Sequence, residues 1–132
     1  MGEGELNKLT EKVIGCAFSV SNSLGAGFLE KVYENALAYE LRKASLRVEQ
    51  QKPINVYYED IIVGEYTADL LIENYLLLEL KTVEKFNEVH LAQSLNYLKA
   101  TNLPLCLLLN FGKPKVEIKR VYLSTNIRNV FS

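Results

Sequence analysis

A chain of 132 residues, 48% hydrophobic and 23% charged, has the size and composition of one globular domain, which we expect to span residues 1–132. The formal net charge of -1 excludes an overall basic field, so any binding of nucleic acid has to rest on a local patch. Two cysteines in apolar segments and one histidine leave no Cys/His zinc set, and no apolar stretch reaches the roughly 18 residues of a membrane span, so we expect a cytoplasmic protein.

Two helices are predicted at the start of the chain. Apolar side chains recur with a helical period from about Leu6 to Asn22, and again from Phe28 to about Lys43. Between these segments, Gly25 and Gly27 favour a turn and the start of a new helix.

The middle of the chain is rich in β-forming residues. Pro53 indicates that the first strand lies at an edge or starts irregularly, and Gly64 permits a bend or bulge. The last two segments are almost wholly apolar, which is typical of central strands covered on both faces. The predicted strands are residues 47–58, 61–63, 66–72 and 75–81.

The remaining segments complete an α/β domain with a mixed β-sheet flanked by helices. A third helix is predicted over about 87–100, followed by a buried strand over 103–110 and an alternating strand over 116–123.

Three charged residues interrupt the two apolar strands. Such residues are almost never fully buried unless they are paired or bind a metal. Glu79 and Lys81 are two residues apart, so they share one face of their strand, and Asp69 lies on the preceding strand.

The turn between these strands decides whether the three side chains meet. If Ile72 pairs with Leu76 around the three-residue loop 73–75, Asp69 falls opposite Glu79 on the same face. A two-residue turn would place the two carboxylates on opposite faces. A shared site therefore requires a loop of odd length or a bulge.

Two carboxylates beside a lysine suit Mg²⁺ or Mn²⁺, which take one or two carboxylates together with waters and substrate phosphate. The corresponding chemistry is metal-assisted attack of water on a phosphodiester, with Lys81 near the developing charge. The spacing alone leaves a second interpretation open, an ordinary ion pair between an acidic residue and Lys81.

The chain also carries four motifs in a recognisable order. Together they resemble the GxxExxY family of small bacterial and archaeal proteins, which is placed in the PD-(D/E)XK nuclease superfamily. The resemblance runs from about residue 6 to residue 112 and includes Lys119-Arg120. The motifs are Gly27-x-x-Glu30-x-x-Tyr33, Asp69, Glu79-Leu-Lys81 and His90-x-x-Gln93-x-x-x-Tyr97.

The resemblance implies a restriction-endonuclease-like core. Asp69 and Glu79 would hold the divalent ion, Lys81 would support the nucleophile, and Glu30 would complete the metal shell. Gln93 and Tyr97 would orient the site and the nucleic-acid strand. Ala68 stands where many members of the superfamily have proline, a difference that concerns strand geometry and not ligand chemistry.

The residues outside the charged trio also have simpler explanations. Glu30 lies in the first turn of its helix, where a carboxylate caps free N–H groups. His90, Gln93 and Tyr97 share one stripe of the third helix, which would equally suit a solvated face. Tyr33 lies beside an apolar stripe and would fit the core with a satisfied hydroxyl group.

The expected function is that of a Mg²⁺- or Mn²⁺-dependent nuclease acting on DNA, with RNA the less favoured substrate. The alternative is a non-catalytic module that keeps the nuclease fold and binds nucleic acid or another protein. Residues 54–62 could supply an edge strand for a homodimer, although helices of the same chain could equally cover that edge.

Overall fold

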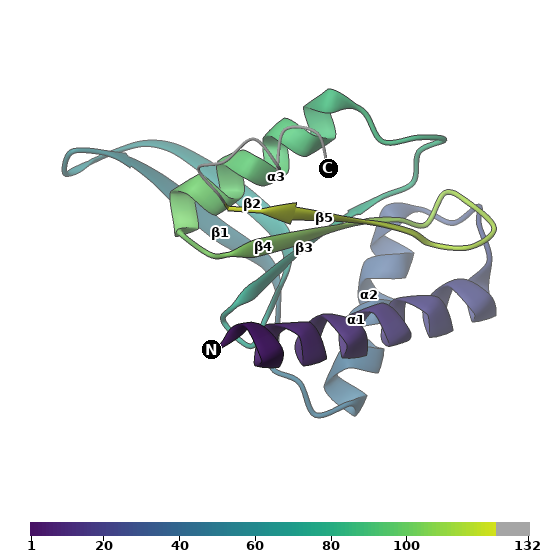
Figure 1. Ribbon diagram of the computed structural model, residues 1–132. Coiled ribbons are helices and arrows are strands. Elements are labelled where there is room, and N and C mark those ends of the chain that lie inside the picture. The colour runs from purple at the N-terminus through teal and green to yellow at the C-terminus, as the bar shows by residue number, and fades with distance from the viewer. Residues whose placement is uncertain (124–132) are drawn as a thin grey trace.

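The computed structural model describes residues 1–123 and forms a three-layer α/β domain (Figure 1). The sheet has the strand order β1-β2-β3-β4-β5, in which only β3 and β4 run parallel. It is therefore mixed, as the sequence predicts. The elements are α1 (Glu3–Leu24), α2 (Glu30–Lys43), β1 (Val48–Tyr58), β2 (Ile61–Ile72), β3 (Leu76–Lys81), α3 (Glu88–Thr101), β4 (Leu105–Asn110) and β5 (Glu117–Tyr122).

Most boundaries lie within three residues of the predicted ones. The main difference is that the predicted strands 61–63 and 66–72 form one continuous strand, β2. Gly64 pairs with Val56, and the register shifts at the next pair, so the predicted irregularity is accommodated without ending the strand. The first helix extends to Glu3 and Leu24, beyond the apolar stripe that predicts it.

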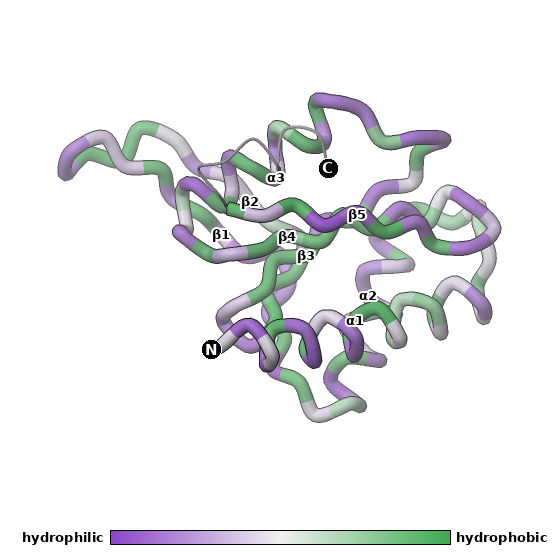
Figure 2. The backbone as a smooth tube through the Cα atoms, viewed as in Figure 1, coloured by the Kyte–Doolittle hydropathy of each residue, from purple (hydrophilic) through white to green (hydrophobic). Residues whose placement is uncertain are grey.

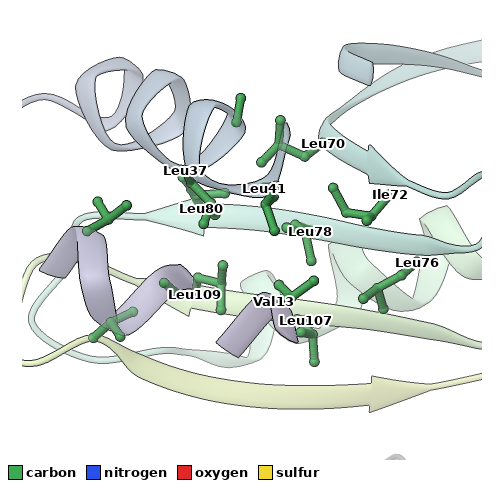
Figure 3. Close-up of a cluster of buried hydrophobic side chains, with 14 of the residues drawn as sticks. Val13, Leu37, Leu41, Leu70, Ile72, Leu76, Leu78, Leu80, Leu107 and Leu109 are labelled. Carbon is green, nitrogen blue, oxygen red and sulfur yellow. The ribbon is translucent and has the colours of Figure 1, made fainter. Parts of the chain in front are cut away.

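Helices α1 and α2 cover one face of the sheet and α3 covers the other. In Figure 3, Leu80 of β3 and Leu109 of β4 point toward the side of the sheet covered by Leu37 of α2 and Val13 of α1. On the opposite face, Leu77 and Leu108 pack with Leu98 of α3. In Figure 2, β3 and β4 are largely green, the colour of hydrophobic residues. Covering on both faces explains why these strands lack polar alternation.

The turn between β2 and β3 has the predicted length. Ile72 pairs with Leu76, and residues 73–75 form the connection, in which Glu73 and Asn74 have left-handed backbones with φ of 55° and 56°. The ladder continues only to Leu70 and Leu78. Beyond that pair, β2 turns away with β1 as a hairpin that projects from the molecule, whereas β3 continues beside β4 (Figure 1).

Strand β1 lies at the edge of the sheet, as Pro53 predicts. The outer end of the β1–β2 hairpin exposes Tyr57, Tyr58, Ile61 and Ile62. This edge is the one that the sequence suggests for a homodimer, and such pairing stays a prediction. None of the helices within residues 1–123 combines the length and the apolar character needed to cross a membrane.

Candidate active site

Asp69 and Glu79 meet where β2 and β3 separate. The backbone N–H of Asp69 donates to Oε1 of Glu79 over 2.9 Å, and the backbone N–H of Leu80 donates to Oδ2 of Asp69 over 2.8 Å. Each carboxylate thus takes a hydrogen bond from the neighbouring strand just past the last ladder pair. Glu79 alternates with Leu78 and Leu80 and so shares the face of Leu77, which α3 covers, and Asp69 meets it at the edge where the strands part.

The surroundings of the two carboxylates disfavour their charged forms. Glu79 is 3% exposed, and burial together with the charge of Asp69 raises its pKa from 4.5 to about 8. Burial also raises the pKa of Asp69, against the opposing effect of the Leu80 N–H. Without a cation, this environment favours the protonated form of Glu79.

Lys81 is not paired with these carboxylates. Its Nζ donates to Oε1 of Gln93 over 3.2 Å. In the described part of the chain, no ion pair within 4.0 Å involves Lys81. Its charge still lowers the pKa of Asp69 and of Glu79. The structure does not support the simple ion-pair interpretation, because a neutral amide holds the ammonium group beside the acidic pair.

Gln93 and Tyr97 of α3 are brought to the same place. The Tyr97 hydroxyl group donates to the backbone carbonyl of Thr67 over 3.2 Å, and Gln93 accepts from Lys81. Tyr97 is 3% exposed, so the solvated-face interpretation is wrong for this residue. Burial and the nearby carboxylates Glu79 and Asp69 raise the pKa of Tyr97 far above its usual range, so it remains a neutral donor.

The Gly27–Tyr33 motif builds the loop that leads into α2. The Tyr33 hydroxyl group donates to the carbonyl of Gly25 over 2.6 Å and accepts the N–H of Phe28 over 3.1 Å. Its ring is fully buried and stacks on Phe111 at 4.8 Å. Gly25 and Gly27 have φ of 67° and 116°, a backbone that glycine adopts without strain. Tyr33 is therefore a core residue with a satisfied hydroxyl group, and it fixes the point at which Glu30 begins the helix.

Glu30 is exposed at the first position of α2. Partial burial of its carboxylate raises its pKa, Lys81 lowers it and Asp69 raises it further. The N–H of Thr82, just after β3, also acts on this carboxylate. Glu30 thus interacts with the same charges as the acidic pair, from the N-terminal turn of α2. Its role as a metal ligand stays a prediction.

The donor set fits a hard divalent cation. Within residues 1–123, no three Asp, Glu, His or Cys side chains form a ready-made set of metal ligands. Mg²⁺ does not require one, because it is commonly bound by one or two carboxylates together with waters and substrate phosphate oxygens. Such a cation would offset the two causes that raise the pKa of Glu79, burial first and then the charge of Asp69.

Two further residues at the site escaped the sequence analysis. Gln51 of β1 donates to Asp69, and Glu34 of α2, 4% exposed, accepts from Gln51. One signal was available: Glu34 lies one turn before Leu37 and Ala38, on the buried side of its helix, where an unexplained carboxylate needs partners.

Comparison with known proteins agrees with this geometry. A family model described as the PD-(D/E)XK nuclease superfamily matches residues 7–121, which is most of the chain. Comparisons with curated proteins and with solved structures found no match. Asp69 on one strand and Glu79-Leu-Lys81 on the next strand of a mixed sheet are consistent with that match. The chain belongs to the PD-(D/E)XK nuclease superfamily.

Proposed function

We propose that this protein is a Mg²⁺- or Mn²⁺-dependent nuclease that hydrolyses phosphodiester bonds of DNA, and RNA less readily. The observation that carries the proposal is the contact between half-buried Asp69 and buried Glu79, with which Lys81 forms no ion pair within the described residues although it stands beside them. In a structural ion pair, the ammonium group of Lys81 would contact a carboxylate directly. A cation site with an adjacent catalytic ammonium group instead needs the carboxylates to stay free for the ion.

Each residue of the site would have a separate role in this reaction. Asp69 and Glu79 would hold the ion, and a bound Mg²⁺ or Mn²⁺ supplies Lewis-acid polarisation of a phosphate oxygen and of a water molecule. Gln93 keeps the ammonium group of Lys81 directed along the α3 side of the acidic pair. From there Lys81 would stabilise the hydroxide or the additional negative charge of the transition state, and lysine suits this task as a compact point charge.

A cleft beside the start of α3 supports a nucleic-acid substrate. It is lined by three lysines and by Glu88 and Glu117, of which Glu117 pairs with Lys113 over 3.8 Å. It encloses about 750 Å³ between the segment before α3 and strands β4 and β5. Lys85, Lys113 and Lys119 line it, and Phe86 offers an aromatic ring. Another lining residue is Leu108, the β-ladder partner of Glu79, so the cleft reaches the strand next to the acidic pair. Lysines placed in this way can neutralise phosphates on a chain with a net charge of only -1.

The test is a substrate panel. Labelled single-stranded, duplex and branched DNA and an RNA strand are incubated with purified protein in Mg²⁺, in Mn²⁺ and in EDTA. We expect metal-dependent cleavage of at least one DNA substrate by the wild type and by Lys8→Ala, a surface control on α1, and none by Lys81→Ala. Equal cleavage by wild type and Lys81→Ala would contradict the proposal. Metal-independent binding without cleavage would favour the non-catalytic module instead.

A further inference from the structure

Gln51 has an unusual backbone for a residue inside a strand. Its φ is 53°, in the left-handed region that side chains other than glycine rarely adopt. The pairs Gln50–Leu70 and Lys52–Ala68 flank it, so Gln51 stands opposite Asp69. A strained conformation of this kind persists only where the surrounding structure imposes it, and such residues cluster at functional sites.

The side chain of Gln51 connects two carboxylates. Its Nε2 donates to Oε1 of Glu34 over 2.7 Å and to Oδ1 of Asp69 over 3.3 Å. A primary amide carries two N–H groups, so both can be used at once. Glu34 is buried, and its other oxygen accepts from Nε2 of Gln50 over 2.7 Å and from Nζ of Lys31 over 3.1 Å. Glu34 is therefore a fixed anchor, held from α2 and from β1.

Both oxygens of Asp69 consequently have a fixed donor. Leu80 holds Oδ2 and Gln51 holds Oδ1. A carboxylate oxygen has lone pairs for both a hydrogen bond and a cation, so these contacts leave room for metal coordination. The amide of Gln51 is neutral, and it can orient the carboxylate without cancelling the charge that attracts the cation. An arginine or lysine at this position would cancel it.

We propose that Gln51, anchored by the buried Glu34, is a positioning residue that sets the orientation of the Asp69 carboxylate for a divalent ion. This inference rests on the proposed function, because it takes Asp69 as a metal ligand. It adds a support on the edge strand β1, so that β1, β2, β3 and α2 all contribute to one site.

The chain offers a matched control. Gln50 and Gln51 each donate to Glu34 over 2.7 Å, and of the two only Gln51 also donates to Asp69. Gln50→Ala and Gln51→Ala therefore each remove one hydrogen bond of 2.7 Å from Glu34 but differ at Asp69. Gln50→Ala also removes contacts with Asn35 and Arg42, neither of which touches Asp69 through Gln50. Gln51→Gly removes the same amide while relieving the left-handed backbone, which keeps the test valid if the alanine variant folds poorly.

The measurement is Mn²⁺ affinity by titration calorimetry at one fixed pH, on variants whose folding is verified by circular dichroism. We expect Gln51→Ala and Gln51→Gly to bind Mn²⁺ about 10- to 100-fold more weakly than the wild type, and Gln50→Ala to bind within about twofold of it. If Gln50→Ala and Gln51→Ala weaken Mn²⁺ binding equally, Gln51 acts only by supporting Glu34, and the inference is overturned. Unchanged affinity in both Gln51 variants would also overturn it. A wild type without saturable Mn²⁺ binding would instead overturn the proposed function, and the inference with it.

Discussion

Asp69 and Glu79 are joined by crossed hydrogen bonds: the N–H of Asp69 donates to the Glu79 side chain, and the N–H of the residue after Glu79 donates to the Asp69 side chain. Both bonds lie just beyond the last ladder pair of β2 and β3. The side chains thus satisfy backbone donors where the strands begin to part, so the proposed metal ligands also stabilise the separation of the two strands.

Glu79→Gln should stabilise the metal-free protein at high pH. The pKa of Glu79 is raised on folding from 4.5 to about 8, so the stability contributed by its protonated form is complete below pH 4.5 and is lost as pH rises through 8. Glutamine keeps an acceptor for the Asp69 N–H and cannot ionise. In EDTA, urea unfolding between pH 5 and 9 should show the variant gaining stability over the wild type as pH rises. Glu11→Gln, on the surface of α1, should show no such trend.

Asp69→Asn should have a smaller effect on the metal-free protein. Asparagine removes the charge repulsion, but it has one acceptor oxygen where Asp69 accepts hydrogen bonds on two, from Leu80 and Gln51. We expect its unfolding free energy in EDTA to lie within about 1 kcal/mol of wild type and below that of Glu79→Gln. A loss of about 3 to 5 kcal/mol in both carboxylate variants would instead indicate a buried structural ion pair with Lys81.

Glu30→Gln tests the extra ligand. If the Glu30 carboxylate joins the cation site, Mn²⁺ affinity should fall about tenfold, because a charged oxygen donor is replaced by an amide. The affinity is measured by calorimetry above pH 8, where the Glu79 carboxyl is ionised. If the Mn²⁺ affinity is unchanged, Glu30 is not a metal ligand, and its carboxylate acts only on the N-terminal turn of α2.

Gly112→Ala should disturb the end of β3. An added Cβ at Gly112 would lie 2.7 Å from the backbone N of Val83 and 2.8 Å from the carbonyl carbon of Thr82, immediately after Lys81. Backbone atoms cannot yield as a side chain can, so we expect a loss of about 1 to 3 kcal/mol in urea unfolding together with reduced activity. Gly15→Ala, in an open position within α1, should instead gain up to about 1 kcal/mol. Equal stability of the two variants would contradict the packing described here.

The strand parity at the site could be predicted because it depends on short-range rules. Side chains alternate along a strand, and the three-residue turn pairs Ile72 with Leu76, a register that brings Asp69 beside Glu79. The two helices and the apolar central strands follow from their periodicity in the same way.

The supporting residues could not be predicted, because they depend on long-range register. Gln51 reaches Asp69 only through the pairing of β1 with β2, and its left-handed backbone has no local signal such as glycine. Tyr97 was assigned to a stripe with Gln93, but the packing of α3 over β2 buries its ring against Tyr66. Assembly, location in the cell and the choice between DNA and RNA stay predictions, since they concern partners beyond the single chain.

Lys81 is the residue whose proposed role in metal-dependent phosphodiester hydrolysis distinguishes an enzyme from a binding module. The most direct test is the single-turnover cleavage rate of wild type and Lys81→Met at saturating Mn²⁺, on a DNA substrate that the wild type cleaves. Because Lys81 donates to Gln93 and forms no ion pair with the acidic pair, the variant should stay folded and bind Mn²⁺ nearly as well as the wild type. We predict that its cleavage rate falls by at least about 100-fold, the size of effect typical for loss of a transition-state charge stabiliser. A rate within a few fold of wild type at saturating metal would contradict the account.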